Sequence, residues 1–200
     1  MAAALTSALL QVGIVLLIGA VTWLALRRPK PFLRFIALTP APWRSVVLGL
    51  VVGAVTAALV TRIPAVQNLS TSERTVVGEA TRGGFTAGVV GLLAIRAVLQ
   101  TSLSEELLFR GVLGHNLVRR LGFVMGNSIQ AALFGSAHLL LLLSPKATLG
   151  LVLAMVVFTG ATGWVMGWVN ERFGKGSILP GWGMHGGGNL TAYLLLASGT

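Results

Sequence analysis

Long apolar runs without a charged side chain constrain the fold of this chain more than any other feature. Four such runs cover residues 5–26, 121–145, 147–170 and 176–200. A helix needs about 20 apolar residues to cross the roughly 30 Å hydrocarbon core of a bilayer, so each run is long enough to span it. The runs are continuous and lack the alternation of a membrane barrel strand. The sequence therefore predicts membrane-spanning helices.

Two further segments are candidate spans. Residues 45–61 form a shorter apolar run, and residues 83–119 form a long segment that four charged side chains interrupt. The second segment is either one long helix or a span followed by a second helix. Only 10% of the residues are charged, where a soluble domain carries about a quarter. We expect an all-α, polytopic transmembrane bundle of about six to seven helices, which forms a single domain over residues 1–200.

The net charge of +10 is explained by the orientation of the helices in the membrane, because basic residues gather on the cytoplasmic side, and it does not indicate a nucleic-acid partner. The first run lacks a basic n-region and is followed directly by "RRPKPFLR", so we interpret it as a first helix and not as a cleaved signal peptide. Nine basic residues then face the cytoplasm: Arg27, Arg28, Lys30, Arg34, Arg44, Arg119, Arg120, Arg172 and Lys175. Four face outward: Arg62, Arg74, Arg82 and Lys146. We expect an integral protein of the bacterial cytoplasmic membrane, with lipid as a partner.

The stretch "SLSEELLFRGV" places charged side chains inside an apolar segment. An ionised side chain at the centre of a membrane helix costs about 2.5–3.5 kcal/mol, so such groups pair, face water or take part in chemistry. Glu106 and Arg110 stand four residues apart on one helical face and can form an ion pair. Glu105 is turned about 100° away from Glu106, which leaves its carboxylate freer to act as a general base. The alternative is a buried structural network.

Two other stretches place polar side chains in apolar runs. "FGSAH" carries His138, and "HGGGN" carries His185 and Asn189 four residues apart on one helical face. A carboxylate and a histidine can remove a proton from water, while a second histidine and an amide can support the resulting oxyanion. Two histidines and a glutamate are also a complete catalytic zinc shell, made here of Glu105, His138 and His185. The residues alone leave both mechanisms open, and a single histidine in a membrane helix is most often a packing or hydrogen-bonding residue.

With these three motifs, the chain resembles the CPBP family (CAAX proteases and bacteriocin-processing enzymes, also called Abi), to which the type II CAAX prenyl endopeptidases belong. The family motifs EExxxR, FxxxH and HxxxN stand here as "EELLFR", "FGSAH" and "HGGGN". The resemblance covers residues 83–198 as a catalytic core, and it leaves residues 1–62 as two accessory transmembrane helices. It implies an intramembrane endopeptidase that cleaves a membrane-associated or C-terminal peptide substrate, in some members a prenylated one.

By this resemblance, Glu105 and His138 activate the water, His185 and Asn189 support the oxyanion, and Glu106 and Arg110 hold the site together. We favour glutamate-activated water over zinc, because no HExxH-type ligand pair is present. No cofactor is firmly implied. The inner-half position of Glu105 predicts a site that opens toward the cytoplasm. The glycines between His185 and Asn189 either allow close helix packing or let a substrate backbone approach.

Other classes of function fit the sequence less well. "HGGG" is also an oxyanion motif of serine esterases, but the G-x-S-x-G elbow is absent and Ser136 lies in an apolar run. A transporter would use buried glutamate and histidine, yet no inverted repeat is evident. His115 lies near the basic end and is expected to be interfacial. The main alternative is a non-proteolytic membrane scaffold or bacteriocin-resistance factor with the same fold.

Overall fold

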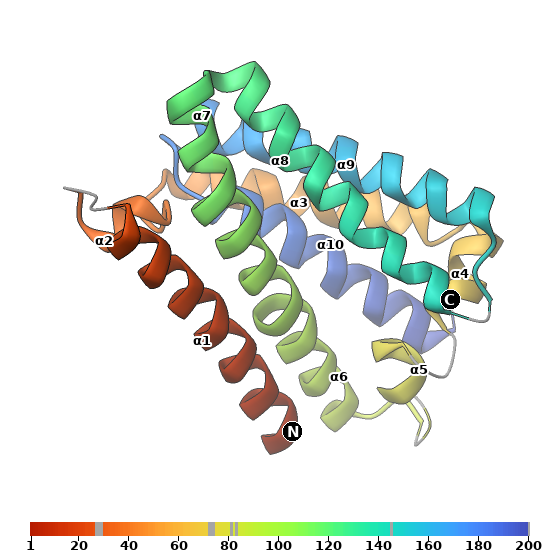
Figure 1. Cartoon of the computed structure of the whole chain (residues 1–200). Helices are drawn as coiled ribbons and strands as arrows, with labels where there is room; N and C mark the ends of the chain where they lie inside the picture. Colours follow the sequence, from red (N-terminus) through yellow and green to blue (C-terminus); the bar gives the residue numbers. More distant parts are fainter. Residues whose placement is uncertain (27–29, 72–74, 81, 83, 145, 200) are drawn as a thin grey trace.

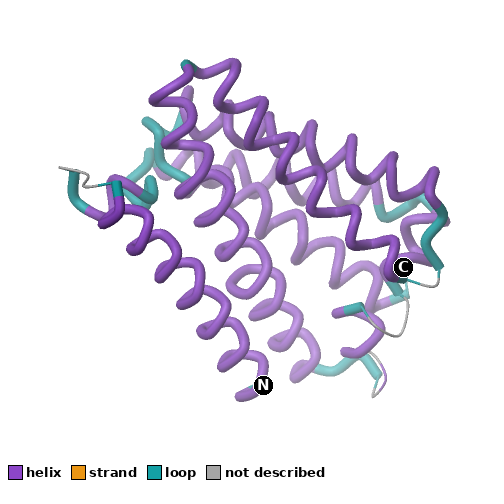
Figure 2. Tube along the Cα trace, in the orientation of Figure 1, coloured by secondary structure: helices purple, strands orange, loops and turns teal. Residues whose placement is uncertain are grey.

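The computed structural model describes residues 1–26, 30–71, 75–80, 82, 84–144 and 146–199, so Arg27, Arg28 and Arg74 lie outside the described residues. The described residues are mostly helical and contain no strand, which confirms the all-α prediction. The long helices lie side by side in one bundle, with short helices and loops at its two ends (Figures 1 and 2). In chain order the helices are α1 (Ala2–Ala25), α2 (Phe32–Phe35), α3 (Trp43–Val60), α4 (Pro64–Ser70), α5 (Val76–Ala80), α6 (Ala87–Ala94), α7 (Asn116–Leu121), α8 (Phe123–Ala137), α9 (Leu149–Arg172) and α10 (Leu179–Ser198).

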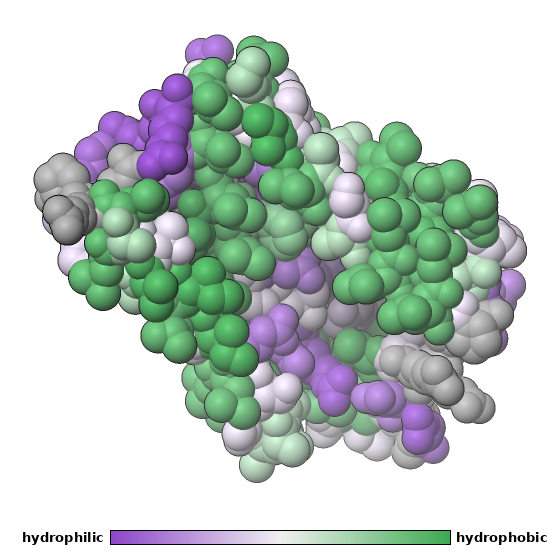
Figure 3. Space-filling view, viewed as in Figure 1, coloured by the Kyte–Doolittle hydropathy of each residue, from purple (hydrophilic) through white to green (hydrophobic). Residues whose placement is uncertain are grey.

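Five stretches within the described residues are long and apolar enough to cross a membrane. They are Ala2–Ala25, Trp43–Val60, Ala87–Leu121, Phe123–Leu143 and Leu149–Arg172. Helix α10, the sixth expected span, has 20 residues but is not among these five, since its glycines, histidine and asparagine lower its hydropathy. Large apolar side chains face outward along these helices, and apolar surface covers much of the face in Figure 3, as lipid contact requires.

The helix that carries "SLSEELLFRGV" is continuous, which answers whether residues 83–119 form one helix or two. It begins after Thr86, whose hydroxyl accepts a hydrogen bond from Val89 N at 3.3 Å, and it runs to Leu121. Between α6 and α7 it widens into two π-helical segments, Ile95–Leu103 and Glu106–His115. Such widenings are rare in helices and frequent at functional sites.

Glycines bring α3 and α10 into close contact. A Cβ atom on Gly53 would lie 1.8 Å from Met184 O, and one on Gly187 would lie 2.7 Å from Leu50 O. Between helices in a membrane, small residues allow the backbones to approach and gain dispersion contacts. Of the two interpretations of the "HGGGN" glycines, close packing is therefore the one that the structure supports. The same packing fixes the position of His185 on α10.

Candidate active site

A buried ion pair occupies the centre of the motif helix. Arg110 Nη1 lies 3.0 Å from Glu106 Oε1, and the two side chains are 2% and 0% exposed. The guanidinium carbon lies 3.9 Å from the centre of the Phe134 ring, a cation–π contact that partly replaces lost hydration. The ion pair expected between these residues is therefore present, and its burial makes each partner costly to remove.

His185 binds the same carboxylate. Its Nδ1 lies 3.0 Å from Glu106 Oε1. Because an ionised carboxylate only accepts hydrogen bonds, Nδ1 carries the hydrogen and donates it to Glu106. The other ring nitrogen, Nε2, lies 3.8 Å from Glu105 Oε2. This distance is too long for a direct hydrogen bond and suits a bridging water.

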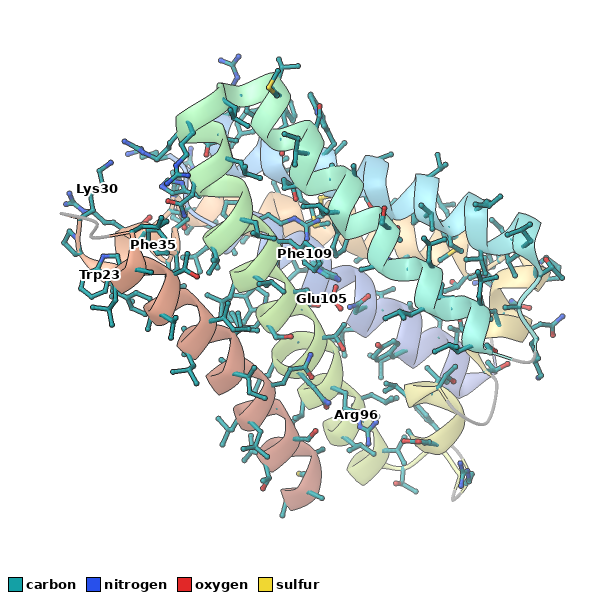
Figure 4. The ribbon with its side chains drawn as sticks, in the orientation of Figure 1. Trp23, Lys30, Phe35, Arg96, Glu105 and Phe109 are labelled. Atoms are coloured by element: carbon teal, nitrogen blue, oxygen red, sulfur yellow. The ribbon has the colours of Figure 1, made fainter. Side chains whose placement is uncertain are left out.

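Both glutamates therefore reach His185, whereas α-helical geometry predicts that they point in different directions. The difference follows from the π-helical segment that begins at Glu106. A π-helix has more residues per turn than an α-helix, so consecutive side chains are turned less far apart. Glu105 remains the accessible carboxylate of the two, with 30% of its side chain exposed against 0% for Glu106. Figure 4 shows it near the middle of the bundle.

The first turn of α10 packs against the buried carboxylate. A Cβ atom on Gly181 would lie 2.9 Å from Glu106 Oε2, so only glycine allows this approach. Gly181 N donates to Asn170 Oδ1 at 2.7 Å, which satisfies a backbone donor at the start of the helix. The positive end of the α10 dipole thus lies beside the Glu106 carboxylate and attracts it.

His138 lies at the end of α8, where the helix tightens into the 3₁₀ segment His138–Leu143. Its Nδ1 lies 3.0 Å from Phe134 O, which can only accept, so Nδ1 carries the hydrogen and Nε2 of the neutral ring is an acceptor. The Phe134 ring makes edge-to-face contacts with His138 and His185, with centroid distances of 5.2 and 5.8 Å. One aromatic ring therefore positions both histidines.

Asn189 is held by a residue that the sequence analysis missed. Its Nδ2 donates to Ser102 Oγ at 3.1 Å, and Ser102 is fully buried in the motif helix. Ser102 Oγ in turn donates to Ala97 O at 2.7 Å. An amide nitrogen carries two hydrogens, so one remains for a ligand. Ser102 opens the quoted stretch, and a hydroxyl in an apolar helix was the signal that could have revealed it.

The two histidines and Asn189 line one cavity of about 430 Å³. Its walls are mostly apolar and come from α3, α4, α5, α8, α9 and α10, with Met166, Met184 and Tyr193 among the lining residues. Glu105 is not among the lining residues of this cavity but lies beside His185, which is. The three polar clusters, which are far apart in the sequence, thus converge at one place.

Two buried amides on α8, Asn127 and Gln130, lie beside Arg110 and were also missed. Asn127 Nδ2 donates to Trp164 O at 2.9 Å, and Gln130 Nε2 donates to Gly163 O at 3.0 Å. Both side chains line a small cavity of about 20 Å³ beside Arg110, which is large enough for one water. Their spacing of three residues in an otherwise apolar run indicates one polar helix face, a signal that could have revealed them.

A zinc site formed by Glu105, His138 and His185 does not fit this geometry. Over the described parts of the chain, no group of three histidine, cysteine, aspartate or glutamate side chains could together hold a metal ion. The Nδ1 atoms of both histidines are bound to Phe134 O and Glu106, so each ring has only Nε2 available for a ligand. We therefore assign no step of the chemistry to a metal.

Comparison with known proteins gives one result. Residues 87–191 match the family model described as "Type II CAAX prenyl endopeptidase Rce1-like". The chain belongs to this family. The match covers more than half of the chain and contains every candidate residue of the site. Neither the curated proteins nor the solved structures contain a match to the chain.

Membership of the Rce1-like family and the five apolar helices together make the chain an integral membrane protein related to CAAX-type intramembrane proteases. The matched region begins at the first residue of the motif helix and ends inside α10. It therefore includes the helices that carry the three motifs.

Proposed function

We propose that this protein is an intramembrane endopeptidase in which Glu105 activates the attacking water. The observation that carries the proposal is the geometry around His185. Its Nδ1 is fixed by the buried Glu106, and its Nε2 faces the exposed Glu105 carboxylate at 3.8 Å. Two acceptors at this separation can each take one hydrogen bond from a water placed between them, which leaves a lone pair of that water free to attack.

The reaction then needs only groups that are present in the chain. The water oxygen attacks the carbonyl carbon of the scissile peptide bond while Glu105 accepts the water proton. In this proposal the remaining N–H of Asn189 donates to the oxyanion of the tetrahedral intermediate, whereas His185 does not share this expected role, because its Nε2 is an acceptor. When the carbon–nitrogen bond breaks, Glu105 returns the proton to the leaving amine. His138, with Nε2 as an acceptor in the cavity, is the second base of the site.

The substrate in this proposal is a peptide that reaches the site with an apolar attachment. The cavity walls offer few free hydrogen-bonding groups, because hydroxyls such as that of Thr159 donate to the backbone of their own helix. A membrane-embedded segment or a lipid-modified C-terminus, including a prenylated one, fits such walls better than a polar peptide does.

The orientation in the membrane follows from charge. Lys30, Arg34, Arg119 and Arg120 lie at the end of the bundle that carries α2 and α7, so this end is proposed to face the cytoplasm of a bacterial cell. The cavity extends from the histidines toward α4 and α5, at the other end (Figure 1). We therefore propose that the cavity opens away from the cytoplasm, and not toward it as predicted from the sequence.

The test is a cleavage assay with purified protein in detergent. A peptide library that includes prenylated C-terminal peptides is offered to the wild type, to Glu105→Ala and to Glu79→Gln as a control. Glu79 is a half-exposed carboxylate that pairs with Arg96 at 3.3 Å, away from the site. We expect cleavage by the wild type and the control, and a loss of at least 100-fold in Glu105→Ala, in line with removal of a general base. Equal cleavage by Glu105→Ala would refute the mechanism, and no cleavage by any protein would favour a scaffold.

A further inference from the structure

A second pocket lies at the basic end of the bundle, away from the candidate active site. Its volume is about 240 Å³, and its lining residues come from two segments that are far apart in the sequence: Lys30, Arg34, Phe35, His115, Asn116, Arg119 and Arg120. Figure 3 shows the hydrophilic surface that gathers at the α2 and α7 end, and Figure 4 shows Lys30 there with several other nitrogen-tipped side chains. Four of the lining side chains are those of lysine or arginine.

The wall of this pocket is fixed by hydrogen bonds. Asn116 Nδ2 donates to Phe35 O at 3.0 Å and to Val112 O at 2.9 Å, and thereby joins the α2 segment to the end of the motif helix. Phe35 is buried beneath it. The cations therefore converge on a built cavity.

The described part of the chain neutralises these cations only in part, through the electrostatic interaction of Glu171 with Arg119. No described carboxylate lies within 4 Å of Lys30, Arg34, Arg119 or Arg120. The nearest acid is Glu171, whose Oε1 lies 3.9 Å from His115 Nδ1. The positive-inside rule accounts for basic residues at this end, but it does not account for four of them around one cavity, where they repel each other. An anion from outside the chain would remove this repulsion.

Aromatic residues place the pocket at the level of the lipid headgroups. Trp23 Nε1 donates to Lys30 O at 2.8 Å, beside the pocket, and its ring contacts Phe32. Trp43, at the start of α3, is 70% exposed and stacks with Arg44. Tryptophan is enriched at the interface between bilayer and water, where its ring spans apolar and polar regions.

We propose that this pocket binds the phosphate of an anionic lipid headgroup. Basic pockets at the cytoplasmic ends of membrane helices are suited to such headgroups, because the arginines can donate paired hydrogen bonds to phosphate oxygens. The proposal is independent of the peptidase reaction, since none of these residues belongs to the candidate active site.

The test measures lipid binding to purified protein in neutral detergent. Dioleoyl phosphatidylglycerol, dioleoyl phosphatidylcholine and inorganic phosphate are each titrated while the unfolding temperature is followed. Three proteins are compared: the wild type, Arg119→Gln/Arg120→Gln, and Arg44→Gln/Arg172→Gln. The last removes two exposed arginines from the same end of the bundle, outside the pocket.

We expect phosphatidylglycerol to bind the wild type and the control variant Arg44→Gln/Arg172→Gln equally. It should bind the pocket variant Arg119→Gln/Arg120→Gln about 30-fold more weakly, because each lost charge weakens binding about fivefold. Phosphatidylcholine should bind none of them measurably. If inorganic phosphate at millimolar concentration gives the whole stabilisation, the phosphate site holds but its ligand is the free ion. Equal weakening in both double variants overturns the proposal, as does unchanged binding to the pocket variant. Arg119→Lys/Arg120→Lys, which keeps the charge, should retain most of the binding and shows that loss is not misfolding.

Discussion

Removing Arg110 should destabilise the protein far more than removing an arginine from an exposed pair. In Arg110→Leu, the fully buried Glu106 carboxylate keeps, among the described residues, only His185 Nδ1 as a side-chain partner. Breaking a buried ion pair by removing one partner costs about 3–5 kcal/mol, because an uncompensated charge remains. A cost of about 4 kcal/mol changes the folding equilibrium by roughly a thousandfold.

The chain offers a matched control for this prediction. Arg96 and Glu79 form the same type of pair at 3.3 Å, but their side chains are 28% and 47% exposed. Arg96→Leu should therefore cost less than about 1 kcal/mol. In the double variant Arg110→Leu/Glu106→Gln, the charge left behind is also removed, so part of the loss should return, with a coupling of about 2 kcal/mol.

The assay is reversible unfolding of the purified protein, followed by circular dichroism at increasing denaturing detergent. Far-ultraviolet spectra before unfolding show whether each variant is folded at the start. If Arg110→Leu and Arg96→Leu lower the free energy of unfolding equally, burial does not determine the strength of these pairs, and the account of the site is wrong. If the double variant is no more stable than Arg110→Leu, Glu106 is not the charge that Arg110 compensates.

Three further outcomes are expected. Gly53→Ala should lower the free energy of unfolding by about 1–3 kcal/mol or more and reduce any cleavage, because its Cβ would meet Met184 O. Gly13→Ala, whose Cβ would have nothing within 4 Å, should raise the free energy of unfolding by up to about 1 kcal/mol. Thermal unfolding of both variants measures these changes. Cleavage should continue in the presence of a strong chelator, because the described residues offer no group of three metal ligands. A loss of cleavage that is reversed by added zinc would contradict this prediction. The chain has no cysteine, so a single introduced cysteine reports which side of the membrane it faces. In intact cells, Ser70→Cys, in the cavity, should react with a membrane-impermeant maleimide, whereas Arg120→Cys should react only after the membrane is opened. The reverse labelling pattern would show that the proposed orientation is inverted.

The architecture was largely predictable from the sequence, because the bilayer imposes it on the chain. Uncharged apolar runs must form helices in lipid, where every backbone group needs a partner within its own segment. The ion pair of Glu106 and Arg110 was predictable for a similar reason, since helical spacing and the cost of an unpaired charge leave few arrangements. The family could be inferred from three motifs in order, and the match over residues 87–191 confirms it.

The details of the site depended on tertiary structure. Sequence spacing separated Glu105 from Glu106, yet a π-helical widening directs both toward His185. The support of Asn189 by Ser102 required knowledge of which helices touch, as did the role of the "HGGGN" glycines against α3.

The sequence by itself determined that this protein lies in a membrane, which apolar runs are long enough to span it and which residues are too costly to be there without a purpose. Those properties depend on transfer between water and lipid, which each segment experiences alone. Only the tertiary structure decided which polar groups meet and where the cavity extends. Contacts between helices depend on close packing at a few glycines and on short hydrogen bonds, to which distant segments contribute jointly.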